Sequence, residues 1–279
     1  MGHCLSAEAE AVLDREFPVL DKGFIRLVDY MGGDERVVQS ARVSYGEGTR
    51  TYRQDADLID YLLRNSHTSP FEQVVLTFHI KLPIFVARQW VRHRTARINE
   101  ISGRYSVLKD DFYVPAPEDV AMQSRDNKQG RLPEPVDPAL SEKIRSQIEE
   151  GQKVSYAAYS SLVNENIARE LARINLPLSL YTEWYWQIDL HNLFHFLELR
   201  LDAHAQREIR LYAAQLLEIA KKVAPRCCAS FEQHVLHSVR FSGSEMAELR
   251  KRLNICNAGG GAEQLSGKAL ERFEKKLKP

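Results

Sequence analysis

Alternating apolar and polar positions predict the strands of this chain. Residues 75–82 (VLTFHIKL) alternate cleanly, with leucine, phenylalanine and isoleucine on one side and threonine, histidine and lysine on the other. This period of two is typical of a half-buried strand. Residues 178–188 show the same alternation. Residues 24–31 (FIRLVDYM) predict a third strand, which ends at a turn formed by Gly32 and Gly33.

Apolar residues at helical spacing predict several helices around these strands. Asp34 and Asp189 are the expected N-caps of two of them, because an aspartate side chain accepts hydrogen bonds from the free amides of a first turn. Pro83 suits the first turn of another helix, which runs towards Arg92. The remaining predicted helices cover residues 55–65, 141–163 and 165–173, the segment after Asp189, and a longer segment that ends at Val223.

Three segments outside this pattern are expected to be irregular. Residues 67–72 (HTSPFE) are expected to form a loop, because Pro70 disfavours helix at the residue before it. Residues 110–138 are polar and proline-rich, which predicts a surface insertion with the sequence NKQG at its tip. Residues 243–279 are expected to be a helical or flexible appendage, since they contain a triple glycine and end in lysine-rich sequence.

The order of these elements predicts the fold class. Strands do not alternate regularly with helices, so a doubly wound parallel sheet is not expected. We predict a single α+β domain over residues 1–242, in which a mixed or antiparallel sheet packs against long helices.

Composition narrows the class of protein. The chain has 279 residues, 44% of them hydrophobic and 27% charged, as in ordinary globular proteins. Its 38 basic residues balance its 38 acidic residues, which argues against binding nucleic acid or a membrane through bulk charge. Neither a spanning segment nor a signal peptide is evident. The four cysteines form no CxxC pair, so we expect neither a zinc framework nor disulfides, and a cytoplasmic location.

The most unusual stretch is residues 92–105, RHRTARINEISGRY. It contains four arginines and a histidine but a single carboxylate, Glu100. Arginine guanidinium groups match phosphate bidentately, so arginines beside Asn99, Ser102 and the amide of Gly103 would form an anion cradle if a helix ends near Arg92. A solvated basic loop, paired with acids elsewhere, remains the alternative.

Several other positions carry candidate chemistry with a plain structural alternative. His191 and His195 share a helix face with Glu198 and Asp202, but the HExxH glutamate is missing, so a polar face is favoured over a metal site. Arg200 is either a snorkelling surface charge or a cation that points into the cavity holding Arg92.

Nucleophiles and nucleotide motifs are weakly signalled. Cys227 and Cys228 have no histidine nearby in the local sequence, so buried inert thiols are favoured over a catalytic cysteine. Ser102 lacks a GxSxG elbow, which favours binding over nucleophilic attack. Neither GxGxxG nor a P-loop occurs. Arg173 lies at the end of a predicted helix, where the simplest interpretation is a cation that stabilises the helix C-terminus.

The cationic stretch fits an Arg-His-Arg triplet, seven residues and then serine. This pattern resembles the signature of flavin-dependent thymidylate synthases. FVARQWVRHR, NEISGRY, HTSPFEQ, LARINLPLSLYTEWYW and FLELRLDAHAQREI also resemble that family, in the family's order, across residues 20–240. The resemblance implies an α+β homotetramer with active sites at subunit interfaces. It also implies methylation of dUMP, with 5,10-methylenetetrahydrofolate as carbon donor and NADPH as reductant through FAD.

The same resemblance implies roles for individual positions. Residues expected at FAD are Ser69, Arg92, His93, Arg94, Glu100, Asp189, His191 and His195, with His67 bordering the folate side. Residues expected at dUMP are Gln89, Arg92, Glu100, Ile101, Ser102, Gly103, Arg104, Arg173 and Arg200. Arg104 is expected to reach a neighbouring subunit's site. Arg200 is the expected catalytic residue, because a fixed cation stabilises negative charge that develops on the uracil ring.

Some positions depart from the family pattern, and other classes of function stay open. Arg97 stands where serine is frequent, and Asp189, His191 and His195 stand where asparagine or arginine is common. A noncatalytic nucleotide- or RNA-binding protein could use the same arginines, with Tyr105, Trp184 and Trp186 stacking on bases. A metal-dependent hydrolase built on the two histidines is a third hypothesis. No metal, nucleic acid or membrane partner is expected.

Overall fold

The computed structural model describes residues 5–43, 52–125 and 129–253. Its centre is a five-stranded sheet in which every neighbouring pair is antiparallel. The strands, in their order across the sheet, are β1 (Glu16–Val19), β2 (Gly23–Met31), β3 (Val75–Pro83), β7 (Tyr181–Asp189) and β4 (Arg97–Glu100). The predicted α+β class with an antiparallel sheet is confirmed.

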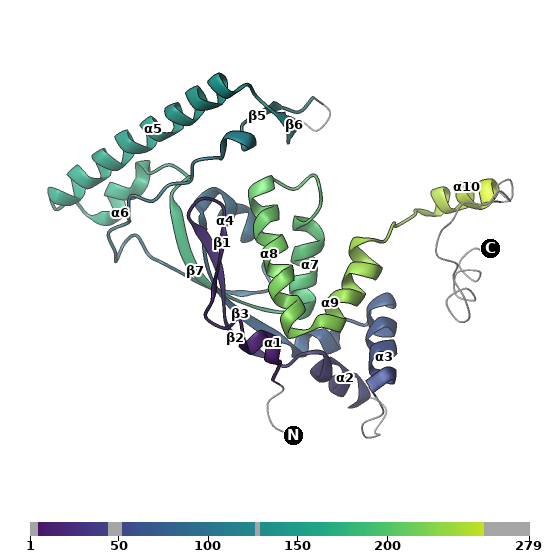
Figure 1. Cartoon of the computed structure of the whole chain (residues 1–279). Helices are drawn as coiled ribbons and strands as arrows, with labels where there is room; N and C mark the ends of the chain where they lie inside the picture. The colour runs from purple at the N-terminus through teal and green to yellow at the C-terminus, as the bar shows by residue number, and fades with distance from the viewer. Residues whose placement is uncertain (1–4, 44–51, 126–128, 254–279) are drawn as a thin grey trace. The chain divides into compact units, whose positions relative to one another are not determined.

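The described helices are α1 Ala7–Glu10, α2 Asp34–Arg42, α3 Tyr52–Arg64, α4 Ile84–Trp90, α5 Pro138–Asn164, α6 Arg169–Ala172, α7 Leu190–Arg200, α8 Arg207–Val223, α9 Pro225–Phe231 and α10 Gly243–Leu253. Of these, α4, α7 and α8 pack against the sheet (Figure 1). Short 3₁₀ helices cover Ser69–Gln73, Pro117–Asp119 and Arg173–Asn175, and a π-helical turn covers Glu232–Leu236.

The two strands with the clearest predicted alternation, β3 and β7, follow it. In β3 the side chains from Leu76 to Leu82 alternate between buried and half-buried positions. The strand predicted from residue 178 begins instead at Tyr181, because Pro177 and the turn after it precede the ladder. The sequence pattern missed β4 entirely, since all four of its residues are exposed and therefore show no apolar alternation.

Three local predictions were wrong in detail. Asp34 does not cap α2, whose N-cap is Gly33; its carboxylate instead accepts hydrogen bonds from the amides of Arg226 and Cys227 at the start of α9. The predicted loop at 67–72 contains a 3₁₀ helix, in which Pro70 is tolerated near the first position. Residues 165–173 form only the short α6 and the beginning of a 3₁₀ turn.

The hydrophobic core lies between the sheet and the helices α4, α7 and α8. Trp90 of α4 packs against Trp184 and Trp186 of β7, with ring centroids 5.7 and 5.1 Å away, and against Phe196 of α7 at 4.6 Å. Burying an aromatic side chain of this size stabilises the fold by about 2–3 kcal/mol. This cluster fixes the end of α4, from which the cationic stretch continues.

The predicted insertion at 110–138 has structure of its own. It contains the 3₁₀ turn already mentioned and a two-stranded hairpin of β5 (Ala121–Gln123) and β6 (Arg131–Pro135). Part of its predicted NKQG tip lies outside the described residues. The long helix α5, next along the chain, buries only Ser141, Gln152 and Tyr159. Its Val154, an apolar residue within the predicted helix 141–163, is 62% exposed.

Contacts divide the chain into two compact units, residues 1–236 and 237–279. The second unit contains α10. The domain boundary near residue 242 stays a prediction, as does the appendage role of residues 243–279. The triple glycine and the lysine-rich end lie outside the described residues, as do Cys4 and Cys256.

Candidate functional site

Helix α4 ends at Trp90, so the cationic stretch leaves the helix at the point that an anion cradle requires. Just there, three predicted site residues meet. Arg200, at the end of α7, donates from Nε to Nε2 of His93 at 2.9 Å and from Nη2 to the carbonyl oxygen of Gln89 at 3.1 Å. Arg200 is therefore a half-buried cation fixed by two acceptors and is not a freely moving surface charge.

The histidine of this cluster is held neutral. Burial lowers the pKa of His93 to about 4, with the positive charge of Arg200 and the nearby His195 acting in the same direction. Burial also lowers the pKa of Arg200. An arginine nevertheless stays charged near neutral pH. A neutral imidazole nitrogen facing a guanidinium acts as the acceptor, so His93 orients Arg200 without adding charge.

One of the other predicted histidines, His195, lies at the rim of this cluster. The rings of His93 and His195 have centroids 5.9 Å apart, and His195 is exposed while His191 is half-buried. Within the part of the chain that the structure describes, no group of three or more histidine, cysteine or acidic side chains could hold a metal ion. The geometry thus offers no support for the metal-dependent hydrolase hypothesis.

Residues 100–105 form a second cluster, built on the edge of β4. Thr182 of β7 donates to the Glu100 carboxylate at 2.6 Å. The chain then turns, and the Ser102 hydroxyl accepts from the Arg104 amide at 3.3 Å. Gly103 is buried here, since an added Cβ would lie 2.9 Å from Leu108 and 3.2 Å from Arg173. Glycine therefore allows Arg173 to pack directly against the turn, whose Ile101 is exposed.

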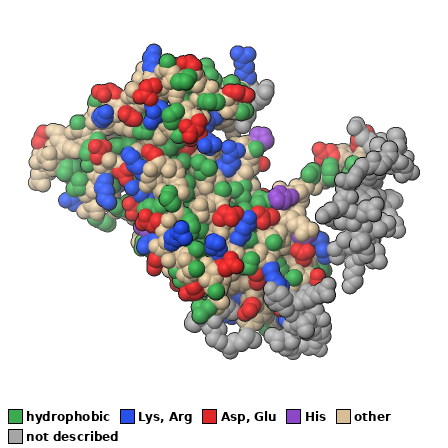
Figure 2. All heavy atoms as spheres, in the orientation of Figure 1, with side chains coloured by type: hydrophobic (Ala, Val, Ile, Leu, Met, Phe, Trp, Pro, Cys, Tyr) green, Lys and Arg blue, Asp and Glu red, His purple; other side chains and the backbone are tan. Residues whose placement is uncertain are grey.

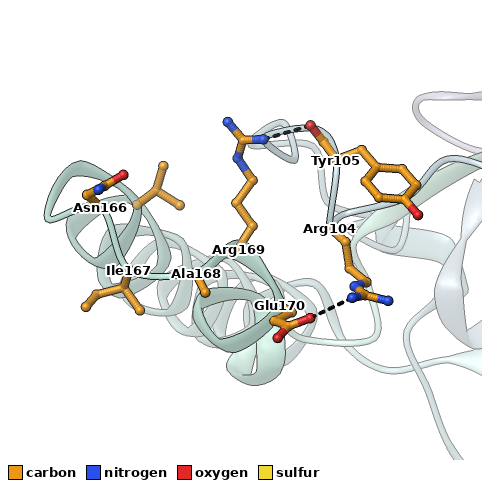
Figure 3. Close-up of a pocket in the computed structure, with 8 residues that line it drawn as sticks. Arg104, Tyr105, Asn166, Ile167, Ala168, Arg169 and Glu170 are labelled. Atoms are coloured by element: carbon orange, nitrogen blue, oxygen red, sulfur yellow. Dashed lines mark hydrogen bonds and ion pairs between the residues drawn. The ribbon is translucent and has the colours of Figure 1, made fainter.

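A groove of about 410 Å³ lies beside this turn (Figure 3). Arg104 reaches across it to Glu170 of α6, with Nη2 3.0 Å from the carboxylate, and Arg169 donates to the Tyr105 carbonyl at 2.7 Å. Both partners of the Arg104–Glu170 pair are more than half exposed. Exposed pairs of this kind contribute about 0–1 kcal/mol, so Arg104 can exchange Glu170 for another anion at little cost.

The remaining arginines of the stretch differ in their contacts. Arg92 and Arg94 are exposed, and neither has a hydrogen bond or ion pair with any residue in 5–43, 52–125 or 129–253. Arg97, which had no assigned role, donates to Gln187 on the neighbouring strand at 3.3 Å. Among the described residues, Arg104 is therefore the only arginine of the stretch that is paired with an acid, as the alternative of a basic surface loop predicts.

Other predicted FAD positions lie towards the opposite end of β7. Strand β4 pairs Glu100 with Trp184, while Asp189 pairs with Val75 at the start of β3, next to the Ser69 helix. Five residues of strand separate these two points, which is about 17 Å at about 3.4 Å per residue. Ser69 and His67 are exposed, and His67 packs edge-on against Tyr61.

Asp189 has a structural role in this chain, as predicted from its position before α7. Its carboxylate accepts from the Asn192 amide at 2.9 Å and from the Asn192 side chain at 2.8 Å. Both oxygens are thus used to begin the helix that carries His191 and His195. A role of Asp189 at FAD stays a prediction.

Sequence reasoning missed the residues that hold the predicted site residues in place. Thr182 holds Glu100, Glu170 holds Arg104, and Gln206 accepts a hydrogen bond from the side chain of Gln89. These partners come from segments far along the chain, so no local motif marks them.

The buried cysteines do not contribute to either cluster. Cys227 and Cys228 are fully buried in α9. Burial raises the pKa of both thiols, and the nearby Asp34 raises it further. They are protonated and shielded, which supports inert thiols over nucleophiles. Among the described residues, no helix combines the length and apolar character needed to cross a membrane.

Comparison with known proteins agrees with this arrangement. Residues 26–226 match the family model described as "Thymidylate synthase complementing protein", and residues 239–279 match "Thymidylate synthase ThyX C-terminal domain". A flavin-dependent thymidylate synthase of Treponema denticola is 66% identical over 95% of this chain and 98% of that protein. Those of Treponema pallidum and Thermus thermophilus are 62% and 56% identical, over 100% and 91% of this chain and 90% and 94% of theirs.

Solved structures of a nucleotide methylase have a similar fold. A UMP/dUMP methylase, PolB from Streptomyces cacaoi, bound with 5-Br UMP, superposes with a TM-score of 0.70 at 31% identity, covering 79% of this chain and 98% of that chain. The same protein bound with 5-Br dUMP gives 0.71 at 30% identity, over 78% and 98%. The chain belongs to the flavin-dependent thymidylate synthase family.

Proposed function

We propose that the chain methylates dUMP to dTMP, with 5,10-methylenetetrahydrofolate as carbon donor and NADPH as reductant through FAD. The observation that carries this proposal is the half-buried Arg200, held by the neutral His93 and the carbonyl of Gln89. A cation that is held in a fixed orientation can stabilise negative charge as it develops on the uracil ring. The family, and the methylase PolB that was solved with 5-bromo nucleotides, support dUMP as the substrate.

The two clusters divide the work on the nucleotide. Gln89 and Arg200 bind the uracil ring, and Arg200 favours its ionisation at N3. Ser102, Gly103 and Arg104, with Ile101 and Glu100 beside them, border the ribose and phosphate. The exposed guanidinium of Arg104 and the backbone of the Ser102–Gly103 turn suit a phosphate. Arg173 completes this pocket through its packing against Gly103.

The cationic residues at the end of α4 fit FAD by the chemistry of their donors. Arg92 and Arg94 present guanidinium groups to solvent, and such forks match a pyrophosphate bidentately. His93 lies between them in the sequence with its ring close to that of His195, and His191 precedes His195 by one turn of α7. Ser69, Asp189 and Glu100, with His67 towards the folate, extend the surface that binds the cofactor. When bound, the flavin supplies the hydride that reduces the transferred carbon.

Ser102 binds substrate in this scheme and does not act as a nucleophile. Its hydroxyl accepts from the Arg104 amide, and no histidine lies within hydrogen-bond distance of it among the contacts of the described chain. A serine without an adjacent base is a weak nucleophile.

A homotetramer with shared active sites is part of the proposal. Leu171, Ile174 and Leu178 follow Glu170, which borders the groove beside Arg104, and all three are more than half exposed. Exposed apolar patches of this kind mark interaction surfaces. The predicted FAD residues also lie at both ends of β7, which suits a site completed by a second copy.

Light scattering on the purified protein tests this assembly. We expect a mass of four chains, and we expect Ile174→Glu to reduce both the mass and the rate of dTMP formation. Lys153→Glu, which changes an exposed polar position of α5, is the matched control and should keep both the mass and the rate. A native monomer with full activity would contradict the shared site.

The cofactor gives a direct test of the function. Protein incubated with FAD is expected to be yellow, and its flavin absorbance is expected to bleach on addition of NADPH. Addition of dUMP and methylenetetrahydrofolate should then restore the colour and yield dTMP. A protein that takes up no FAD would overturn the proposal.

The alternative of a noncatalytic nucleotide- or RNA-binding protein is not favoured. Trp184 and Trp186 cannot stack on bases, because they are 1% and 0% exposed. Tyr105 alone among the three proposed aromatics is exposed. Basic and acidic side chains are interspersed over the displayed face (Figure 2), which does not form the continuous basic track that single-stranded nucleic acid requires.

A further inference from the structure

The 110–138 insertion is attached to helix α8 by buried charge. Glu208, in the first turn of α8, is 3% exposed. Its Oε1 accepts from Arg131 Nη2 at 2.6 Å and from the Tyr113 hydroxyl at 3.1 Å. Arg131 also donates from Nη1 to the Asp119 carbonyl at 2.6 Å. Two residues of the insertion are thus bonded to one carboxylate of the core, and Arg131 links a third, Asp119, to it.

Glu208 is ionised in this environment. Burial alone would raise the pKa of Glu208, but the hydrogen bond and positive charge of Arg131 overcome this and lower it below its ordinary value. Asp119 forms a second pair with Arg207, the residue before Glu208. A buried ion pair adds little to the stability of the fold, because desolvation of the two charges offsets much of their attraction. The hydrogen bonds of this pair nevertheless fix the position of the insertion relative to the first turn of α8.

The position that this pair fixes borders the substrate cluster. Gln206 is the N-cap of α8, two residues before Glu208. Its side-chain oxygen accepts from Nε2 of Gln89, whose own carbonyl accepts from Arg200 at 3.1 Å. A continuous set of contacts therefore runs from the insertion, through the first turn of α8, to the residues proposed to hold the uracil.

We propose that Arg131 and Glu208 are positioning residues for the nucleotide: through the first turn of α8 they place Gln206, which orients the Gln89 side chain towards the pyrimidine. This inference rests on the proposed function, and it assigns a role to the insertion. The Arg131 side chain is bonded to Glu208 and Asp119 and acts through α8, so we expect its loss to weaken nucleotide binding and to leave the flavin unaffected.

Calorimetric titration of the FAD-loaded full chain with dUMP tests this proposal. Arg131→Met is expected to weaken dUMP binding by about tenfold, the scale of one or two hydrogen bonds. FAD affinity and the rate of bleaching by NADPH should stay at the wild-type level. Gln206→Ala should weaken dUMP to a similar extent. The double variant Arg131→Met/Gln206→Ala should be no weaker than either single variant, because both changes act on the same contact.

Arg145→Met is the matched control. Arg145 also holds the insertion, by donating from Nε to the Pro115 carbonyl at 3.0 Å, but it does so from α5 and not from α8. It should bind dUMP like the wild type. If Arg131→Met does not fold, Arg131→Lys replaces it, since a lysine cannot bond Glu208 and Asp119 in the same fork.

The outcomes separate this inference from the proposed function. Wild-type protein that binds no dUMP would overturn the function itself. Wild-type protein that binds dUMP, together with an Arg131 variant of equal affinity, would overturn only the positioning role. Losses that multiply in the double variant would also contradict it, because they would show that Arg131 and Gln206 act independently.

Discussion

The two clusters that contain the predicted nucleotide residues differ in burial and in how firmly contacts within the chain hold their side chains. At the end of α4, Arg200, His93 and Gln89 are partly buried and bonded to one another. At the turn after β4, Arg104 and Tyr105 are exposed, and the Arg104 side chain pairs with an exposed carboxylate. The first cluster is organised before substrate arrives, whereas the second is free to change partners.

This difference indicates a division of labour. Preorganised charge near a reacting ring lowers the barrier of the chemical step, because it need not rearrange during the reaction. An exposed cation contributes mainly to binding a charged group, such as a phosphate. Loss of Arg200, the charged member of the first cluster, should therefore act mainly on turnover, and changes in the second cluster on substrate affinity.

The largest effect is expected for Arg200→Ala. Loss of the fixed cation should slow dTMP formation by about 10²- to 10³-fold, as for loss of one preorganised donor in other enzymes. NADPH should still reduce the flavin, since Arg200 acts on the nucleotide. Parallel assays of dTMP formation and flavin bleaching check this. Arg15→Ala, beside the opposite edge strand of the sheet, is the control, and equal loss in both assays would contradict the role.

A smaller effect is expected for Arg104→Ala. Loss of a charged hydrogen bond to the phosphate should raise the KM for dUMP by about 10- to 100-fold, while kcat changes little. Steady-state kinetics at varied dUMP measure both constants. Arg169→Ala serves as the control, because Arg169 contacts only the backbone of Tyr105 in this turn. A fall in kcat with constant KM would remove the distinction between the two clusters.

Ser102→Ala should have a still smaller effect. Removing the hydroxyl costs one neutral hydrogen bond, about 1 kcal/mol, or about fivefold. Turnover should persist, because the hydroxyl binds and does not attack. If the variant still binds dUMP and FAD normally but forms no dTMP, Ser102 takes part in the chemical step and the proposed binding role is wrong.

The least change is expected at His93 as the pH varies. The ring should stay neutral from about pH 8 down to about pH 5, because burial and Arg200 lower its pKa to about 4. In the unfolded chain it takes up a proton near pH 6.5. This group therefore lowers the free energy of unfolding as the pH falls from about 6.5 to 4. Histidine NMR of the folded protein, with His93→Gln for assignment, checks it; titration near the ordinary histidine pKa would contradict the buried contact.

Much of the fold could be predicted from sequence because its signals are local. The alternation in β3 and the Asp189 cap of α7 depend on neighbouring residues, and both are present in the structure. Strand β4 could not be predicted, since the exposed sequence RINE has no apolar face. The Asp34 carboxylate accepts hydrogen bonds from the amides that begin α9, almost two hundred residues away, which no local pattern can signal.

The site shows the same limit. The cationic stretch and its helix end were visible in the sequence, and the resemblance assigned residues to ligands. The support for those residues was not visible, because Gln206, Thr182 and Glu170 approach from distant segments. Such contacts arise from the sheet register and helix packing, so they become apparent only in the folded chain.

A single-turnover experiment tests the proposed function most directly. Protein whose bound FAD has been reduced is mixed without oxygen with dUMP and methylenetetrahydrofolate, and flavin absorbance and dTMP are measured together. We predict that one flavin is reoxidised for each dTMP formed, because the hydride that completes the methyl group comes from the flavin. Formation of dTMP while the flavin stays reduced, or no dTMP with all ligands bound, would contradict the account.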